Sequence, residues 1–327
     1  MTAASAWRAR FDRHARLLTA VLFAIGLLIP LAATELGLRW YGVGHPLLYE
    51  TNPVWGFRPK PNQTVRRYDG NVVHTNNLGL RANADWDSVA GNKVLFLGNS
   101  VTFGSSYVSN EDLFSERVTR GDPRWVAGNA GVNGWGVENI YGLIVTSRFH
   151  LARVYISVLI EDDFYRGLAR KSSLLRETSP LLAVQAAIPT AVARIRGRAG
   201  RVDTLDTAAL DRRAREAVER LAALDSAIRR SGAIHLIYLS PYLSNLNDAQ
   251  PPDARLRDRL AEAGIGVARI ADRPRLRSMS AAERKALFHD DVHLNKAGHL
   301  VWSAIIKPDL DSALAADSLR RAHVADR

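Results

Sequence analysis

Residues 93–100 read KVLFLGNS, and this stretch decides the fold. The run 93–97 is mostly apolar, as in a strand buried on both faces of a parallel sheet, and Gly98 ends it. Ser100 then falls at the turn from a strand into a helix. Ligands of open parallel sheets bind beyond the carboxyl ends of the strands. The sequence therefore predicts a reactive serine at this edge of a sheet.

The rest of the chain alternates apolar runs with helical patterns. Strands are expected at 93–97, 125–128, 153–160, 233–239 and 266–270, and helices at 112–119, 207–231 and 296–306. Alternating strands and helices pack as a parallel sheet with helices on both faces. The predicted fold class is a three-layer α/β/α domain with a five-stranded parallel sheet of the flavodoxin-like type.

A second chemical motif, DDVH, runs from Asp290 to His293, just before a helical stretch. Its acid and imidazole stand three residues apart, so that one loop can carry both. In a serine hydrolase a histidine takes the serine proton and an aspartate holds the imidazole in the right tautomer. Ser100, His293 and Asp290 are therefore the candidate catalytic residues. His289 and His299 are expected at the surface.

Composition narrows the possible chemistry. The chain has 327 residues, 47% of them hydrophobic, a net charge of +11 and no cysteine. The absence of cysteine excludes disulfides, thiolate metal sites and a cysteine nucleophile. The arginines are scattered and form no stripe or known binding motif, so we expect no nucleic-acid partner. We also expect no cofactor and no metal.

The N-terminus carries a strong membrane signal. Residues 17–34, LLTAVLFAIGLLIPLAAT, are uncharged, and a membrane helix needs about 20 mainly apolar residues. Trp40 and Tyr41 suit the interface. The arginines that precede this run predict that residues 1–16 are cytoplasmic and that the rest is periplasmic or extracellular. The alternatives are a cleaved signal peptide, with small residues at Ala32 and Ala33, and a buried helix of a soluble protein.

These signals divide the chain. We expect a cytoplasmic basic tail at 1–16, a transmembrane anchor at 17–41, a linker and packed extension at 42–90, the α/β domain at 91–315 and a C-terminal tail at 316–327. An insertion at 166–206 breaks the alternation. Its basic and apolar residues fit a cap over the site, a membrane-facing segment or a flexible insertion.

Four blocks across residues 93–306 resemble, in order, those of the SGNH (GDSL) hydrolases. Block I is GNSVTFG, with Asn99 in place of the family's aspartate, and block II is NAGVNGWG at 129–136. The resemblance implies that Ser100 is the nucleophile. It also implies that the backbone N–H groups of Ser100 and Gly134 line an oxyanion hole. Block V is DDVH, followed by LNKAGH, which is expected to cap the last helix.

Block III departs from the family pattern. It ends in IEDDF, so that Asp162 aligns with the family asparagine that donates to the oxyanion. A carboxylate there repels the developing charge, and loss of one such donor costs about 2.7–4 kcal/mol of transition-state stabilisation. Either Asp162 is protonated in a dry site, or it turns away and leaves two backbone donors. The acidic run 161–163 also invites a metal site, although ligands from other segments are not evident.

The resemblance implies a function. The protein is expected to be a serine esterase or O-acyltransferase/deacetylase that acts on acyl esters of cell-envelope glycans. It is also expected to cross the inner membrane once. Its expected partners are an acylated glycan or lipid ester and the membrane itself. One alternative, motivated by Asp162 and Asn99, is a degenerate member that binds acylated glycan without turning it over. Another is a scaffold of an envelope-assembly complex.

Overall fold

The computed structural model describes residues 3–67, 69–87, 92–147, 152–172, 175–196, 206–248 and 251–325. The chain forms two compact units. The first consists of Met1–Pro46 and Ser179–Ala199, and the second of Leu47–Thr178 and Gly200–Arg327.

A parallel sheet is the centre of the second unit. Among the described residues, five strands form it in the order β6-β5-β7-β8-β9. Their bounds are Asn92–Gly98 for β5, Trp125–Asn129 for β6, Val154–Leu159 for β7, Ile234–Leu239 for β8 and Ala268–Arg269 for β9. This is the flavodoxin-like order, in which the first strand lies inside the sheet. The predicted fold class is confirmed, and each predicted strand is present.

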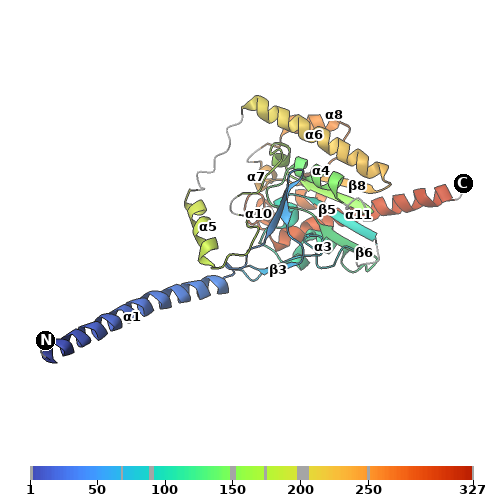
Figure 1. The fold of residues 1–327 in the computed structure, drawn as a ribbon. Coiled ribbons are helices and arrows are strands. Elements are labelled where there is room, and N and C mark those ends of the chain that lie inside the picture. Colours follow the sequence, from blue (N-terminus) through green and yellow to red (C-terminus); the bar gives the residue numbers. More distant parts are fainter. Residues whose placement is uncertain are drawn as a thin grey trace. The chain divides into compact units, whose positions relative to one another are not determined.

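Helices cover both faces of this sheet (Figure 1). One face carries α4 (Val137–Thr146), α6 (Thr207–Arg230) and α8 (Ala254–Glu262), and the other carries α3 (Phe114–Thr119) and α11 (Lys296–Ala325). Strand β5 supplies both cores, because alternate side chains of a strand point to opposite faces. Leu95 and Leu97 pack with α4 and α6, whereas Val94 and Phe96 pack with α3 and α11.

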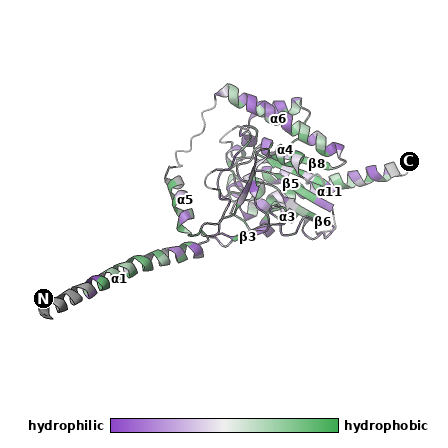
Figure 2. Cartoon of the chain, viewed as in Figure 1, coloured by the Kyte–Doolittle hydropathy of each residue, from purple (hydrophilic) through white to green (hydrophobic). Residues whose placement is uncertain are grey.

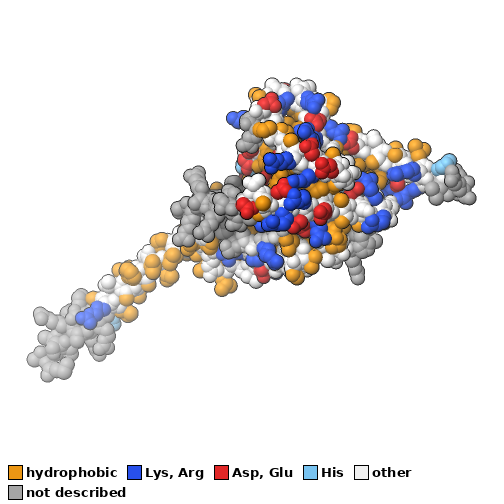
Figure 3. All heavy atoms as spheres, turned by 90° about the horizontal axis from the view of Figure 1, so that it is seen from above, with side chains coloured by type: hydrophobic (Ala, Val, Ile, Leu, Met, Phe, Trp, Pro, Cys, Tyr) orange, Lys and Arg blue, Asp and Glu red, His pale blue; other side chains and the backbone are white. Residues whose placement is uncertain are grey.

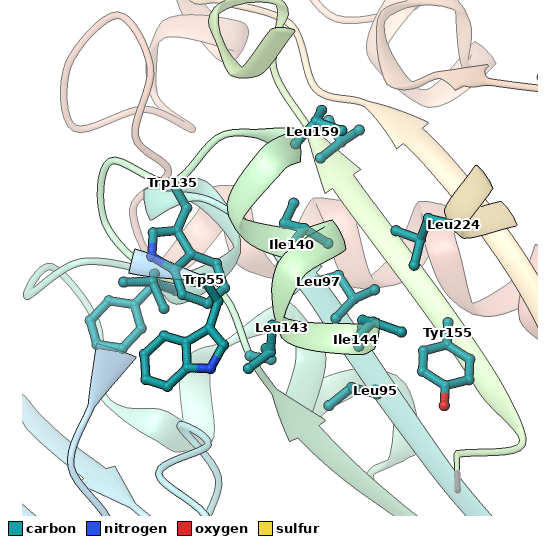
Figure 4. Close-up of a cluster of buried hydrophobic side chains, with 14 of the residues drawn as sticks. Trp55, Leu95, Leu97, Trp135, Ile140, Leu143, Ile144, Tyr155, Leu159 and Leu224 are labelled. Atoms are coloured by element: carbon teal, nitrogen blue, oxygen red, sulfur yellow. The ribbon is translucent and has the colours of Figure 1, made fainter. Parts of the chain in front are cut away.

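Two β-hairpins before the sheet pack onto its α4 side. They are β1 (Tyr49–Asn52) with β2 (Gly56–Pro59), and β3 (Gln63–Arg66) with β4 (Val72–Thr75). The indole N–H of Trp135 donates to the Phe57 carbonyl at 2.7 Å. Figure 4 shows Trp55 beside Trp135, next to Ile140 and Leu143 of α4. This segment is therefore part of the core rather than a free linker.

The last helix is longer than predicted. We expected 296–306, but α11 continues through Pro308 to Ala325. Trp302, Ile306 and Leu310 stand four residues apart and are buried at 0%, 0% and 3% exposure. The apolar face thus continues past the proline, and its burial offsets the one backbone hydrogen bond that proline removes.

Short helical segments connect the larger elements at the carboxyl edge of the sheet and around it. They are α2 (Ser100–Phe103), η1 (Asn110–Asp112), η3 (Glu161–Phe164), α7 (Leu243–Leu246), η5 (Ile270–Asp272), α9 (Pro274–Arg277) and α10 (Ala281–Lys285). On the face seen in Figure 3, basic and acidic side chains of the second unit are intermixed. This agrees with the scattered arginines of the sequence.

The first unit contains α1 (Ala3–Trp40) and α5 (Val184–Arg196). Among the described residues, one helix, His14–Trp40, is long and apolar enough to cross a membrane, with a mean hydropathy of 2.4. Figure 2 shows its apolar middle. Its side chains there are exposed to the surroundings. By length and composition, this helix suits a membrane span or a signal sequence.

Candidate active site

The turn from β5 into α2 presents Ser100. Position 98, at the end of β5, requires glycine because a Cβ there would collide with the side chain of Thr102 and the carbonyl of Val158. Asn99 is the N-cap of α2, since its Oδ1 accepts a hydrogen bond from the Val101 N–H at 2.7 Å. Ser100, the first residue of this short helix, is 9% exposed at the carboxyl edge of the sheet.

His293 links this serine to a carboxylate. Its Nε2 lies 2.8 Å from Ser100 Oγ, and its Nδ1 lies 2.7 Å from Asp290 Oδ2. Asp290 Oδ1 also accepts the backbone N–H groups of Val292 at 2.8 Å and His293 at 2.7 Å. Partial burial alone would raise the pKa of Asp290, but these hydrogen bonds outweigh it and lower the pKa. An ionised Asp290 keeps the proton of neutral His293 on Nδ1, so that Nε2 is free to accept the serine proton.

Neighbouring residues fix the loop that carries this pair. The Asp291 carboxylate accepts hydrogen bonds from Ser244, through the backbone N–H at 2.8 Å and the hydroxyl at 2.9 Å. On the other side, Asn295 Oδ1 accepts the N–H groups of Ala297 at 2.9 Å and Gly298 at 3.1 Å. The predicted cap of the last helix is therefore confirmed, and the loop is held at both ends.

The glycine-rich block II lies beside this turn. The Val132 N–H donates to the Gly98 carbonyl at 3.2 Å, which brings the loop after β6 next to the end of β5. Gly134 is exposed and has φ +81°, a left-handed conformation that side chains with a Cβ rarely adopt. Glycine thus leaves the backbone of this loop open to an approaching molecule.

Asp162 is exposed rather than enclosed. Its side chain is 62% exposed, and its Oδ2 lies 3.6 Å from Arg166 Nη2. Its backbone N–H donates to the hydroxyl of Tyr242 at 3.3 Å. Of the two alternatives that the sequence left open, a dry site for Asp162 is wrong, because solvent and Arg166 reach its carboxylate.

The adjacent Asp163 is the buried carboxylate. Its Oδ2 accepts Asn99 Nδ2 at 2.6 Å and the Ile160 N–H at 3.0 Å, and its Oδ1 lies 2.7 Å from Arg166 Nη1. Burial raises its pKa to about 7, against the opposing effect of Arg166. An aspartate at position 99 would face this carboxylate, whereas Asn99 donates to it. The departure in block I therefore has a structural reason.

Sequence reasoning missed Arg81 and Tyr107. Arg81 is fully buried, and burial lowers its pKa to about 9. Its guanidinium donates to the carbonyls of Phe103, Ser105 and Val108, and so holds the loop that follows α2. In that loop the ring of Tyr107 meets the ring of His293 edge to face, with centroids 5.4 Å apart. No periodic pattern in the sequence marks either residue.

The two other histidines of this region differ from each other. His289 is exposed, as predicted, and stacks on Tyr107 with ring centroids 3.8 Å apart. His299 is wrongly predicted as a surface residue, because it is 0% exposed and its Nδ1 accepts the Phe114 N–H at 3.3 Å. Burial, reinforced by nearby arginines, lowers its pKa to about 3.

A second Ser-His-Asp chain lies inside the protein. His235 Nε2 is 2.9 Å from Ser157 Oγ, and His235 Nδ1 is 2.9 Å from Asp225 Oδ1. Ser157 and His235 are 0% and 2% exposed, on adjacent strands of the sheet. No substrate reaches a serine at this depth, so this chain fastens β7 and β8 to α6. Accessibility, not hydrogen-bond geometry, distinguishes Ser100.

The three acidic side chains at 161–163 have different partners and do not converge on one point. Glu161 accepts the Asp253 N–H at 2.9 Å, while Asp162 and Asp163 have the partners given above. In the described part of the chain, no group of three His, Cys, Asp or Glu side chains is arranged to hold a metal ion.

No protein-family model and no curated protein sequence matches the chain. Solved structures do resemble it. A two-domain esterase active on acetylated mannans, crystallized with mannopentaose, is 15% identical, with a TM-score of 0.42 and coverage of 68% of this chain and 50% of that one. An acetyl xylan esterase is 12% identical, with a TM-score of 0.41 and coverage of 65% of this chain and 96% of that one.

A member of the lipolytic protein G-D-S-L family from Veillonella parvula is 14% identical, with a TM-score of 0.35 and coverage of 66% of this chain and 97% of that one. These identities and TM-scores are low, so we base the roles of the side chains on the geometry of the site itself.

Proposed function

We propose that this protein is a serine esterase or O-acyltransferase of the SGNH type, anchored in a membrane by α1. The observation that supports the chemistry is the chain Ser100–His293–Asp290, with 2.8 Å and 2.7 Å hydrogen bonds at the carboxyl edge of the sheet. The Ser157 chain has a similar hydrogen-bonding arrangement, but it is buried and no substrate can reach it.

Acylation uses each of these groups in turn. Ser100 Oγ attacks the carbonyl carbon of an ester while His293 Nε2 takes the serine proton. Asp290 stabilises the imidazolium that forms. The carbonyl oxygen becomes an oxyanion, stabilised by the N–H groups of Ser100 and Gly134. Collapse of this intermediate breaks the ester C–O bond, and His293 gives its proton to the leaving alcohol.

Deacylation repeats these steps with a second hydroxyl compound. His293 takes a proton from the incoming group, whose oxygen attacks the acyl-Ser100 carbonyl, and the proton returns to Ser100 as the acyl group leaves. Water as the acceptor gives an esterase or deacetylase, and a sugar hydroxyl gives an O-acyltransferase. Acyl esters of cell-envelope glycans are the substrate class that the sequence resemblance implies.

The test uses the full-length protein in detergent. The wild type should hydrolyse p-nitrophenyl acetate, and Ser100→Ala and His293→Ala should each lower kcat at least about 10³-fold. Ser157→Ala is the matched control, because it removes a serine with a similar hydrogen-bonding arrangement and should keep the activity. A fluorophosphonate probe should label the peptide that contains Ser100.

Two results would contradict this proposal. The first is equal activity in the wild type and Ser100→Ala. The second is a folded wild type that neither hydrolyses the ester nor reacts with the fluorophosphonate. The second result would favour the alternative, a degenerate member that binds acylated glycan.

A further inference from the structure

Helix α5 begins at a carboxylate of the apolar helix α1. Glu35 accepts the backbone N–H groups of Ala183 at 2.7 Å and Val184 at 3.3 Å, which caps the start of α5. Arg39 Nε lies 2.6 Å from the same carboxylate, and Arg39 Nη2 donates to the Leu181 carbonyl at 2.7 Å. These contacts fix the first turn of α5 to the last turns of α1.

This attachment sets the depth of α5. Trp40 and Tyr41, at 92% and 55% exposure, end α1 with aromatic rings suited to a membrane interface. Glu35 precedes Trp40 by about 7–8 Å along the helix axis, at 1.5 Å per residue. When α1 spans a bilayer, the first turn of α5 therefore lies at the boundary between the acyl chains and the headgroups.

The outer side of this segment is apolar. Ala183 and Ala186 are buried, at 0% and 9% exposure. Ile188 and Val192 stand four residues apart, on one side of the helix, and Leu181 and Leu182 precede them. All four are exposed, at 57%, 38%, 85% and 48% respectively.

The charge of this segment suits an anionic surface. Residues 179–202 contain no aspartate or glutamate. They contain four arginines, all in the second half: Arg194, Arg196, Arg198 and Arg201. Basic side chains near an anionic leaflet are attracted to its headgroups. An apolar side together with arginines is typical of helices that lie in the membrane interface.

We propose that α5 is an interfacial helix that lies on the leaflet at the C-terminal end of α1 and binds anionic lipid. This rests on the proposed anchoring by α1. The chain then passes between the membrane-bound first unit and the second unit at three places, 46–47, 178–179 and 199–200.

The test exploits the absence of cysteine from the chain. Single cysteines replace Ile188 of α5, Phe23 of α1 or Glu219 of α6, and each carries an environment-sensitive NBD fluorophore. The full-length variants are reconstituted in phosphatidylcholine vesicles with or without phosphatidylglycerol, and brominated lipids serve as quenchers. Retained esterase activity and circular dichroism show that each labelled variant is folded.

The fluorophore at position 188 should be blue-shifted and lose most of its emission to brominated lipid, as should the one at position 23, while the one at 219 should lose little. Arg194→Gln with Arg196→Gln should weaken quenching at 188 in vesicles with phosphatidylglycerol.

Quenching at 23 without quenching at 188 would overturn the docking of α5 and leave the anchor standing. No quenching at position 23 or at position 188 would overturn both the anchoring by α1 and the docking of α5. Equal quenching at 188 with and without phosphatidylglycerol would overturn the preference for anionic lipid.

Discussion

Asp162 is the departure from the family pattern that bears directly on the proposed oxyanion hole. An amide at this position would supply a donor where a carboxylate repels the oxyanion, and a full donor is worth about 10²–10³ in kcat. Because solvent and Arg166 already screen this carboxylate, we expect Asp162→Asn to raise kcat roughly tenfold, with little change in KM. Asp162→Ala is the control, since it removes the charge without adding a donor. Unchanged rates in both variants would show that the backbone donors suffice.

His299 makes stability depend on pH. In the unfolded chain the imidazole of His299 is protonated below about pH 6.5, but in the folded protein its buried imidazole has a pKa of about 3. Between these values the unfolded state binds more protons, so that the free energy of unfolding falls as pH falls, by up to about 1.4 kcal/mol per pH unit. Urea denaturation at several pH values in this range should show that the free energy of unfolding of His299→Gln depends less steeply on pH than that of the wild type. His289→Gln, at an exposed site, should keep the wild-type slope, and equal slopes for all three proteins would contradict the prediction.

At the scale of elements, the segment between β4 and β5 holds the loop between α2 and η1. This connection runs through Arg81, whose fork reaches three carbonyls of that loop. Arg81→Lys keeps the charge but cannot span these acceptors, so we expect a loss of about 2–4 kcal/mol in the free energy of unfolding. Tyr107 then loses its position beside His293, and kcat should fall. Arg66→Lys, on an exposed position of β3, should change either quantity little.

The strands and the candidate site were predictable because their signals are local. A short apolar run rich in β-branched residues, such as 154–159, is typical of a strand covered on both faces, and Asp290 and His293 share one loop. Arg81 was not predictable, because three of its hydrogen bonds go to main-chain carbonyls, which leave no trace in the sequence. His299 had a signal that we misjudged: it stands three and seven residues before Trp302 and Ile306, on the apolar face of α11.

At the scale of the whole molecule, the charges that precede the apolar run of α1 predict its orientation in the membrane. Arginines at 8, 10, 13 and 16 precede the apolar run, so the N-terminus should stay in the cytoplasm and the second unit should cross the membrane. In intact cells whose outer barrier has been removed, an impermeant maleimide should label Arg320→Cys, which is 72% exposed, but not Ser5→Cys. The full-length protein should also stay in the membrane fraction at alkaline pH. Release from the membrane with a shortened N-terminus would identify a cleaved signal peptide instead. Labelling of Ser5→Cys but not of Arg320→Cys would show that the orientation is the opposite of the predicted one.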